Sequence, residues 1–166
     1  MSSNIKNTLI NFLSFFLIAF SLYIFISLIS YDSSDSGFWY RDSSLVINNL
    51  GGPLGALISD FLMSLIGFGS YLFLLICSTW CIQTLFFNNS GYSKLDNLLR
   101  IVSSILFLIC FCAISEFYFQ NNFGGFLGEL IFKNLSSLVG EIGALIFLVI
   151  LIIPSISMSL NFSWLK

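Results

Sequence analysis

Between Gly51 and Gly67, large apolar residues recur at the spacing of one helix face. The stretch reads GGPLGALISDFLMSLIG, and its large apolar members include Leu54, Leu57, Ile58, Phe61, Leu62, Leu65 and Ile66. An i, i+3, i+4, i+7 rhythm with small or polar residues in between is typical of an amphipathic helix. Pro53 suits the first turn of a helix, and the flanking glycines favour sharp turns. The pattern predicts a short amphipathic helix at about 53–66 that leads into a membrane span.

The same pattern returns 73 positions later, in the stretch from Gly124 to Gly140. This second stretch reads GGFLGELIFKNLSSLVG, so both copies begin Gly-Gly-x-Leu-Gly and both end in glycine. The apolar stripe also repeats and is interrupted at Asn134 alone. The repetition predicts a second amphipathic helix at about 126–139 and a duplicated structural unit.

Four apolar runs are each long enough to cross a bilayer as a helix. They lie at about 9–29, 68–87, 101–119 and 142–160. A helix rises 1.5 Å per residue, so about 20 residues cover a hydrocarbon core of about 30 Å. Pro154 predicts a kink in the last run. Residues 1–166 are therefore predicted to form one all-α, polytopic integral membrane domain, in which amphipathic helices precede spans two and four.

The charge distribution predicts the orientation of these spans. Only 8% of the residues are charged, against about a quarter in soluble domains. Four spans place both termini on one side of the membrane, together with most of the basic residues, namely Lys6, Lys94, Arg100 and Lys166. Seven of the eight acidic residues lie toward the other side. The positive-inside rule then predicts that both termini are cytoplasmic and that both amphipathic helices lie on the outer face.

Few residues are suited to chemistry. The chain has no histidine, which excludes histidine-based triads, and it has no G-x-x-x-x-G-K-[ST] motif to cradle a nucleotide. Its four cysteines lie inside apolar runs, where packing as small hydrophobic residues is the expected role; they are Cys77, Cys81, Cys110 and Cys112. We therefore predict neither a catalytic site nor a metal or cofactor site in this chain.

Three acidic residues, Asp60, Glu116 and Glu141, are candidates for proton or ion handling. A carboxylate within a bilayer is a functional suspect because its isolated charge is costly there. All three map to the outer interfacial level, where water or lipid headgroups solvate a charge, and Asp60 lies on the polar face of the first amphipathic stretch. No charged residue occupies the centre of a span, which disfavours a secondary transporter.

Motifs along nearly the whole chain resemble the N-terminal four-helix membrane domain of the FtsK/SpoIIIE family of bacterial cell-division DNA translocases. The matching residues, in chain order, are 30–32, Asp35, 49–56, Asp60, Gly67, 71–72, 124–128, Gly140, 143–144 and 162–165. The family tends to have proline where this chain has Ser33, Ser36 and a leucine near Leu74. Family members also continue into a cytoplasmic RecA-like ATPase, and this chain stops before such a motor domain.

The resemblance implies a non-catalytic anchor that places a DNA translocase at the division septum of the bacterial inner membrane. The implied partners are the lipid bilayer, other cell-division membrane proteins and further copies of the chain, as a hexamer. DNA, ATP and Mg²⁺ are expected only at the missing motor. The candidate structural and interaction residues are Gly51, Gly52, Pro53, Gly55, Asp60, Gly67, Gly124, Gly125, Gly128 and Gly140.

Two other functions fit the same pattern. A small channel or transporter subunit would use the two Gly-Gly units as parallel repeats about a pathway. A stand-alone membrane scaffold would use the same helices without a motor. The sequence also leaves open whether the chain is a fragment or a complete product, and a P-loop in the reading frame after Lys166 would indicate a fragment.

Overall fold

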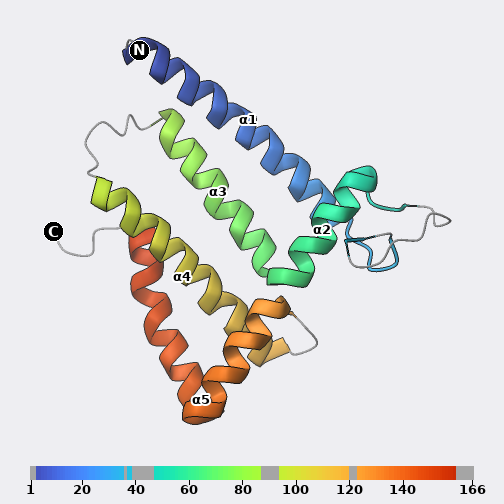
Figure 1. The fold of residues 1–166 in the computed structure, drawn as a ribbon, viewed down its shortest axis with the longest axis vertical. Helices are drawn as coiled ribbons and strands as arrows, with labels where there is room; N and C mark the ends of the chain where they lie inside the picture. The colour runs from blue at the N-terminus through green and yellow to red at the C-terminus, as the bar shows by residue number, and fades with distance from the viewer. Residues whose placement is uncertain (1–2, 36, 39–46, 87–93, 120–122, 160–166) are drawn as a thin grey trace. The chain divides into compact units, whose positions relative to one another are not determined.

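The computed structural model describes residues 3–35, 37–38, 47–86, 94–119 and 123–159. Within these ranges the regular structure is entirely helical (Figure 1), as the sequence predicts. The helices are α1 (Ser3–Ile29), α2 (Gly52–Ile66), α3 (Gly69–Phe86), α4 (Lys94–Phe119) and α5 (Gly125–Ser159). Several residues named above lie outside the described ranges: Ser36, Lys166, the motif at 162–165, and the ends of the predicted spans at 87 and 160.

Three of these helices are long and apolar enough to cross a membrane on their own. They comprise Thr8–Ile29 of α1, Leu95–Phe119 of α4, and the whole of α5. Helices α2 and α3 meet at a bend of 106°, and they provide a fourth span if the bent pair is counted as one. The described residues therefore hold three or four candidate spans, which agrees with a membrane helical domain.

Helix α5 contains both the predicted amphipathic stretch at 126–139 and residues 142–159 of the predicted span at 142–160. Its backbone leaves the helical region at Gly140, where φ is 76° and ψ is 164°. The ribbon changes direction within α5 (Figure 1). Beyond this break the helix continues through Pro154 to its end at Ser159. The predicted boundary between the two segments thus falls at a glycine inside one long element.

The chain divides into two compact units. The first unit comprises Met1–Phe61 and Tyr71–Gly91, and the second comprises Leu62–Ser70 and Tyr92–Lys166. In the first unit the buried apolar side chains come from three helices and are Ile24, Leu28, Ala56, Leu74 and Ile76. Each unit therefore has a small core of its own.

The core of the second unit lies between α4 and α5, which run side by side (Figure 1). Cys110 and Ala113 of α4 pack with Leu148 of α5, and all three are buried. Partly buried residues surround this cluster on both helices; they include Leu106, Ile114, Ile131, Phe132, Leu135, Leu151 and Ile152. The burial of Cys110 fits the prediction that the cysteines pack as small apolar residues.

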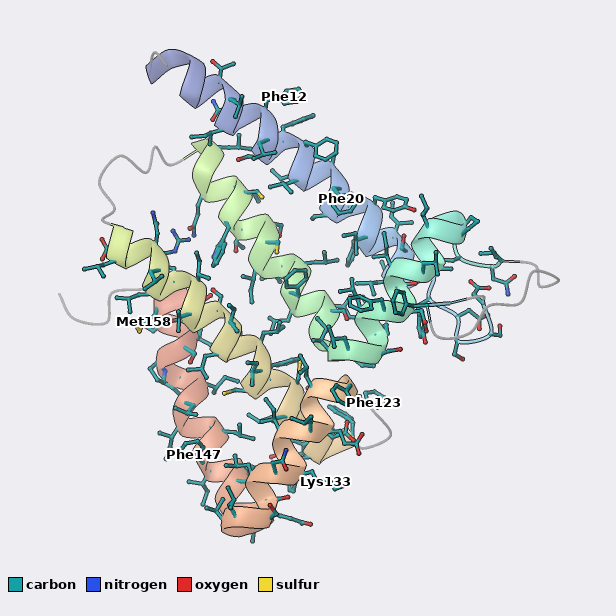
Figure 2. All side chains as sticks on the ribbon, in the orientation of Figure 1. Phe12, Phe20, Phe123, Lys133, Phe147 and Met158 are labelled. Carbon is teal, nitrogen blue, oxygen red and sulfur yellow. The ribbon has the colours of Figure 1, made fainter. Side chains whose placement is uncertain are left out.

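Most large apolar side chains point away from these small cores. Phe12, Phe20 and Phe147 are exposed examples (Figure 2). Conversely, α2 packs through its small residues, since Ala56 and Ser59 are buried while Leu54 is exposed. Small residues let helix backbones approach closely, and hydrocarbon tails solvate the large apolar ones. This distribution is the one expected of a protein whose solvent is lipid.

Candidate interaction site at two glycine turns

Seven of the ten candidate residues lie in two glycine turns, which begin α2 and the first part of α5. The first glycine turn is residues 49–55, and the second glycine turn is residues 123–128. In the first turn the Gly55 N–H donates to the Gly51 carbonyl at 3.2 Å, and in the second the Gly128 N–H donates to the Gly124 carbonyl at 3.1 Å. The same hydrogen bond therefore starts both helices.

Four glycines with positive φ mark the ends of the two repeated stretches. They are Gly52 (66°), Gly67 (54°), Gly125 (63°) and Gly140 (76°). From 52 to 125 and from 67 to 140 the distance along the chain is 73 residues, the offset of the sequence repeat. A side chain in this left-handed region is strained, so the repeat conserves its backbone path through these glycines.

Each glycine turn packs closely against a small residue of the preceding helix. A β-carbon on Gly55 would lie 2.6 Å from both Ser27 Oγ and Asn49 Oδ1. A β-carbon on Gly128 would lie 2.5 Å from the carbonyl oxygen of Cys112. The two turns therefore need glycine for the same reason, although side-chain atoms crowd the first and backbone atoms crowd the second.

The first glycine turn is held by the buried amide of Asn49. Its Nδ2 donates to the Ser27 carbonyl at 2.8 Å, to Ser59 Oγ at 3.2 Å and to the Ser30 carbonyl at 3.3 Å. Its Oδ1 accepts the Gly51 N–H at 2.9 Å. The Asn49 side chain thus connects the end of α1 to the start and the first turns of α2. Asn49 is not among the site residues predicted from the sequence.

Two further residues complete this network. Asp35 is buried and accepts the backbone N–H groups of Asn48 and Asn49 at 2.8 and 2.9 Å. The Tyr23 hydroxyl donates to the Gly51 carbonyl at 2.8 Å. Buried polar groups are stabilising only when they are hydrogen-bonded, and each of these has a partner. Asp35 stood in the family motif but not among the predicted site residues.

Asp60 anchors the loop between α1 and α2. Its Oδ2 accepts the Phe38 N–H at 2.7 Å, and its Oδ1 accepts the Tyr31 hydroxyl at 3.5 Å. Burial, and then the nearby Asp60 charge, raise the pKa of Tyr31 above its ordinary value. The sequence placed Asp60 on a polar, solvated face; in the structure it is half-buried and its contacts are structural.

The second glycine turn uses a different set of partners. Glu116 Oε2 accepts the Gly124 N–H at 3.0 Å. The Phe68 N–H donates to the Phe123 carbonyl at 2.9 Å, and the two rings stack with centroids 4.8 Å apart. Glu116, one of the three candidate acids, therefore fixes the backbone of the second glycine turn. The break after α2, at Gly67 and Phe68, lies directly against this turn.

The remaining predicted residues are more open. Pro53 is exposed at the second position of α2, and a β-carbon on Gly52 or Gly140 would meet nothing within 4 Å. Glu141 is exposed. Among the described residues, no three His, Cys, Asp or Glu side chains gather in a way that could hold a metal ion.

The repeat, the glycine turns and the lipid-facing helices together describe a membrane domain, and comparison with known families identifies which one. A family model described as the 4TM region of DNA translocase FtsK/SpoIIIE matches residues 6–166. The chain belongs to this family. The matched region is the membrane part of the FtsK/SpoIIIE translocases and not their ATPase motor.

Curated relatives agree with this assignment. DNA translocase FtsK of Haemophilus ducreyi is 31% identical over 166 residues, which cover 95% of this chain and 16% of the relative. DNA translocase FtsK of Pseudomonas putida is 25% identical over 156 residues, which cover 89% of this chain and 19% of the relative. The chain thus spans less than a fifth of the length of these FtsK proteins. No solved structure matches it.

Proposed function

We propose that this chain is the non-catalytic membrane anchor of a DNA translocase and that it places the translocase at the division septum. The observation that carries the proposal is the polar network around the first glycine turn, in which Asn49, Asp35 and Asp60 form hydrogen bonds with backbone groups of the same unit. Polar groups used in this way position a helix. A motor elsewhere in the full-length protein would bind ATP, Mg²⁺ and DNA.

The anchor lies in the bacterial inner membrane with both termini in the cytoplasm and with both glycine turns on the outer face. The sorting of basic residues supports this orientation. Reporter enzymes fused to the two ends test it, because a reporter that requires an oxidising periplasm stays inactive at a cytoplasmic terminus. Activity of that reporter at either terminus would overturn the orientation.

The outer surface of α2 is the proposed contact with other division membrane proteins. Its polar bonds fix the helix from one side, while Leu54 and Phe61 of the apolar stripe remain exposed on the other. Phe61 also packs against Phe38, with ring centroids 5.3 Å apart. Copies of the anchor associate with one another in the same membrane, as a hexamer if they follow the family's motor.

A localisation experiment tests the septal role. The chain is fused to a fluorescent protein and expressed in dividing cells, as the unsubstituted form, as Leu54→Asp and as Asn134→Asp. Leu54→Asp removes a leucine-sized apolar contact worth about 1.5–3 kcal/mol when covered, so septal enrichment should fall several-fold while membrane insertion persists. Asn134→Asp adds the same charge at an exposed position outside α2 and should localise normally.

Two results would refute the proposal. Even distribution of the unsubstituted chain around the envelope would remove the septal role. Normal septal enrichment of Leu54→Asp would show that the exposed stripe of α2 is not the contact surface.

A further inference from the structure

The first helix break, Gly67 and Phe68, forms a close junction with the second glycine turn. A β-carbon on Gly125 would lie 2.5 Å from the Gly67 nitrogen and 2.7 Å from the Ile66 nitrogen. The Cys112 thiol also donates to the Ile66 carbonyl at 3.3 Å. The break that ends one repeated stretch is therefore packed, backbone to backbone, on the turn that begins the next.

The equivalent surfaces at the other two ends of the repeat are open. Gly140, the second helix break, corresponds to Gly67, and Gly52 in the first glycine turn corresponds to Gly125. A β-carbon on either would meet nothing within 4 Å. Ile66 is buried in the junction, whereas the equivalent Val139 is exposed. Gly67 and Gly125 thus form one filled junction within the chain. Gly140 and Gly52 are the two surfaces that would form an equivalent junction, and both are open.

The most exposed apolar side chains lie at these two open ends. Among the described large apolar residues, the highest exposed fractions are those of Leu138 (81%), Leu50 (77%) and Ile142 (75%). Leu138 and Ile142 flank the second helix break, and Leu50 precedes Gly52 in the first glycine turn. Along the helices, exposed apolar residues are solvated by lipid tails. These three residues lie instead beside Gly140 and Gly52, and the equivalent glycines of the filled junction, Gly67 and Gly125, are covered by protein.

We propose that the second helix break of one copy packs on the first glycine turn of the next copy. The contact is heterologous, because different surfaces of the two copies meet, and such contacts generate rings or open filaments. The proposal rests on the self-association in the proposed function and names its surface. It places Leu138 and Ile142 of one copy over Leu50 of its neighbour.

The intermolecular contact differs in detail from the internal one. Glu141 and Leu50 occupy the positions of Phe68 and Phe123, so the ring stack has no counterpart. Ile142 occupies the position of Gly69. A β-carbon on Gly69 would lie only 2.5 Å from Cys112 Sγ, so the internal junction has no room for a side chain at this position. The backbones therefore lie farther apart between copies, and apolar side chains fill the space.

Cross-linking between two differently tagged copies tests the contact. One copy carries Leu138→Cys, the other carries Leu50→Cys, and both are expressed as full chains in the same bacterial membrane. After treatment with a short bifunctional thiol reagent, we expect at least a tenfold excess of the mixed dimer over the unsubstituted chain, whose native cysteines give the background. The matched control pair is Phe12→Cys with Leu95→Cys, which are similarly exposed (74% and 70%) but lie on spans.

The outcomes separate this contact from the proposed function. A mixed dimer no stronger than the control pair overturns the contact, as does preferential cross-linking of position 50 to 50 or of 138 to 138. Septal localisation is scored in the same cells. A septal chain without the mixed dimer refutes this contact alone, whereas an evenly distributed chain refutes the proposed function.

Discussion

The two glycine turns have the same backbone geometry but are held by different side chains. Both begin a helix with a Gly-x-x-x-Gly segment packed against a small residue of the preceding helix. The first turn is fixed by the side chains of Asn49 and Asp35, whereas the second is fixed by Glu116 and by contact with the Cys112 backbone. The glycine framework is thus conserved within the molecule while its partners have diverged.

The length of the connecting loop explains the difference. Residues 30–51, 22 in number, separate α1 from α2, whereas only residues 120–124, 5 in number, separate α4 from α5. Fixing each further residue costs conformational entropy, and in the described part of the long loop Asp35 and Asp60 accept the backbone N–H groups of Asn48 and Phe38. The end of the short loop is held by the hydrogen bond from the Gly124 N–H to Glu116 and by the bond from the Phe68 N–H to the Phe123 carbonyl. The longer loop therefore has the larger polar network, whereas the glycines are the same in both turns because both helices begin in the same way.

The largest expected effect is that of Gly125→Ala in the second turn. The new β-carbon would combine a positive φ with a clash against the backbone of Ile66 and Gly67, so we expect a loss of at least about 3 kcal/mol in the free energy of unfolding. Gly52→Ala has a similar φ in open space and should cost about 1 kcal/mol. Unfolding titrations in mixed micelles measure both, and equal losses would mean that the junction is not tightly packed.

Asn49→Leu should come next, because it breaks the first turn alone. It removes an amide that satisfies several buried groups, and we expect a loss of about 2–3 kcal/mol in the free energy of unfolding. Asn134→Leu is the control, since this exposed amide donates to the Leu130 carbonyl of its own helix and not to a neighbouring element of the described residues. The same titration should place that variant within about 0.5 kcal/mol of the unsubstituted chain.

Glu116→Gln weakens the second turn by a smaller amount. An amide oxygen still accepts the Gly124 N–H, but the charge that strengthens this hydrogen bond is lost, so we expect a loss of about 1 kcal/mol in the free energy of unfolding. Glu129→Gln changes an exposed carboxylate and serves as the control. If the two variants are equally stable, Glu116 does not hold the turn.

The smallest effect concerns the acid response of the first loop. Hydrogen bonds from the Ser34 backbone, the Ser34 hydroxyl and the Asn48 amide hold the pKa of Asp32 below its ordinary value of 3.8. Because the folded pKa is depressed, the stabilisation is present above about pH 3.8 and is lost as the pH falls through the folded value. Ser34→Ala should raise the pKa toward 3.8 in an NMR titration, whereas Ser33→Ala, at an exposed neighbour, should leave it unchanged.

Local pattern was enough to predict the helices and the repeat. The 3.6-residue rhythm after Gly51 depends only on which residues lie three and four positions apart, and the glycines at 52, 67, 125 and 140 allow the positive φ found where these helices begin or break. Residue spacing also located the break at Gly140 inside what the structure shows as one long element. These features follow from backbone geometry, which nearby residues decide.

Long-range contacts could not be predicted in this way. Asn49 belonged to the family motif without an assigned role, and the structure places its amide among Ser27, Ser30 and Ser59. Asp60 was expected to be solvated, and in the structure it accepts the N–H of Phe38, 22 residues earlier in the chain. In a lipid-solvated protein, apolarity does not say which side of a helix packs inward, because hydrocarbon and protein interior are equally suitable. The sequence alone determined the helical path and its glycine breaks; only the tertiary structure decided that the small face of α2 packs inward and that Gly67 meets Gly125.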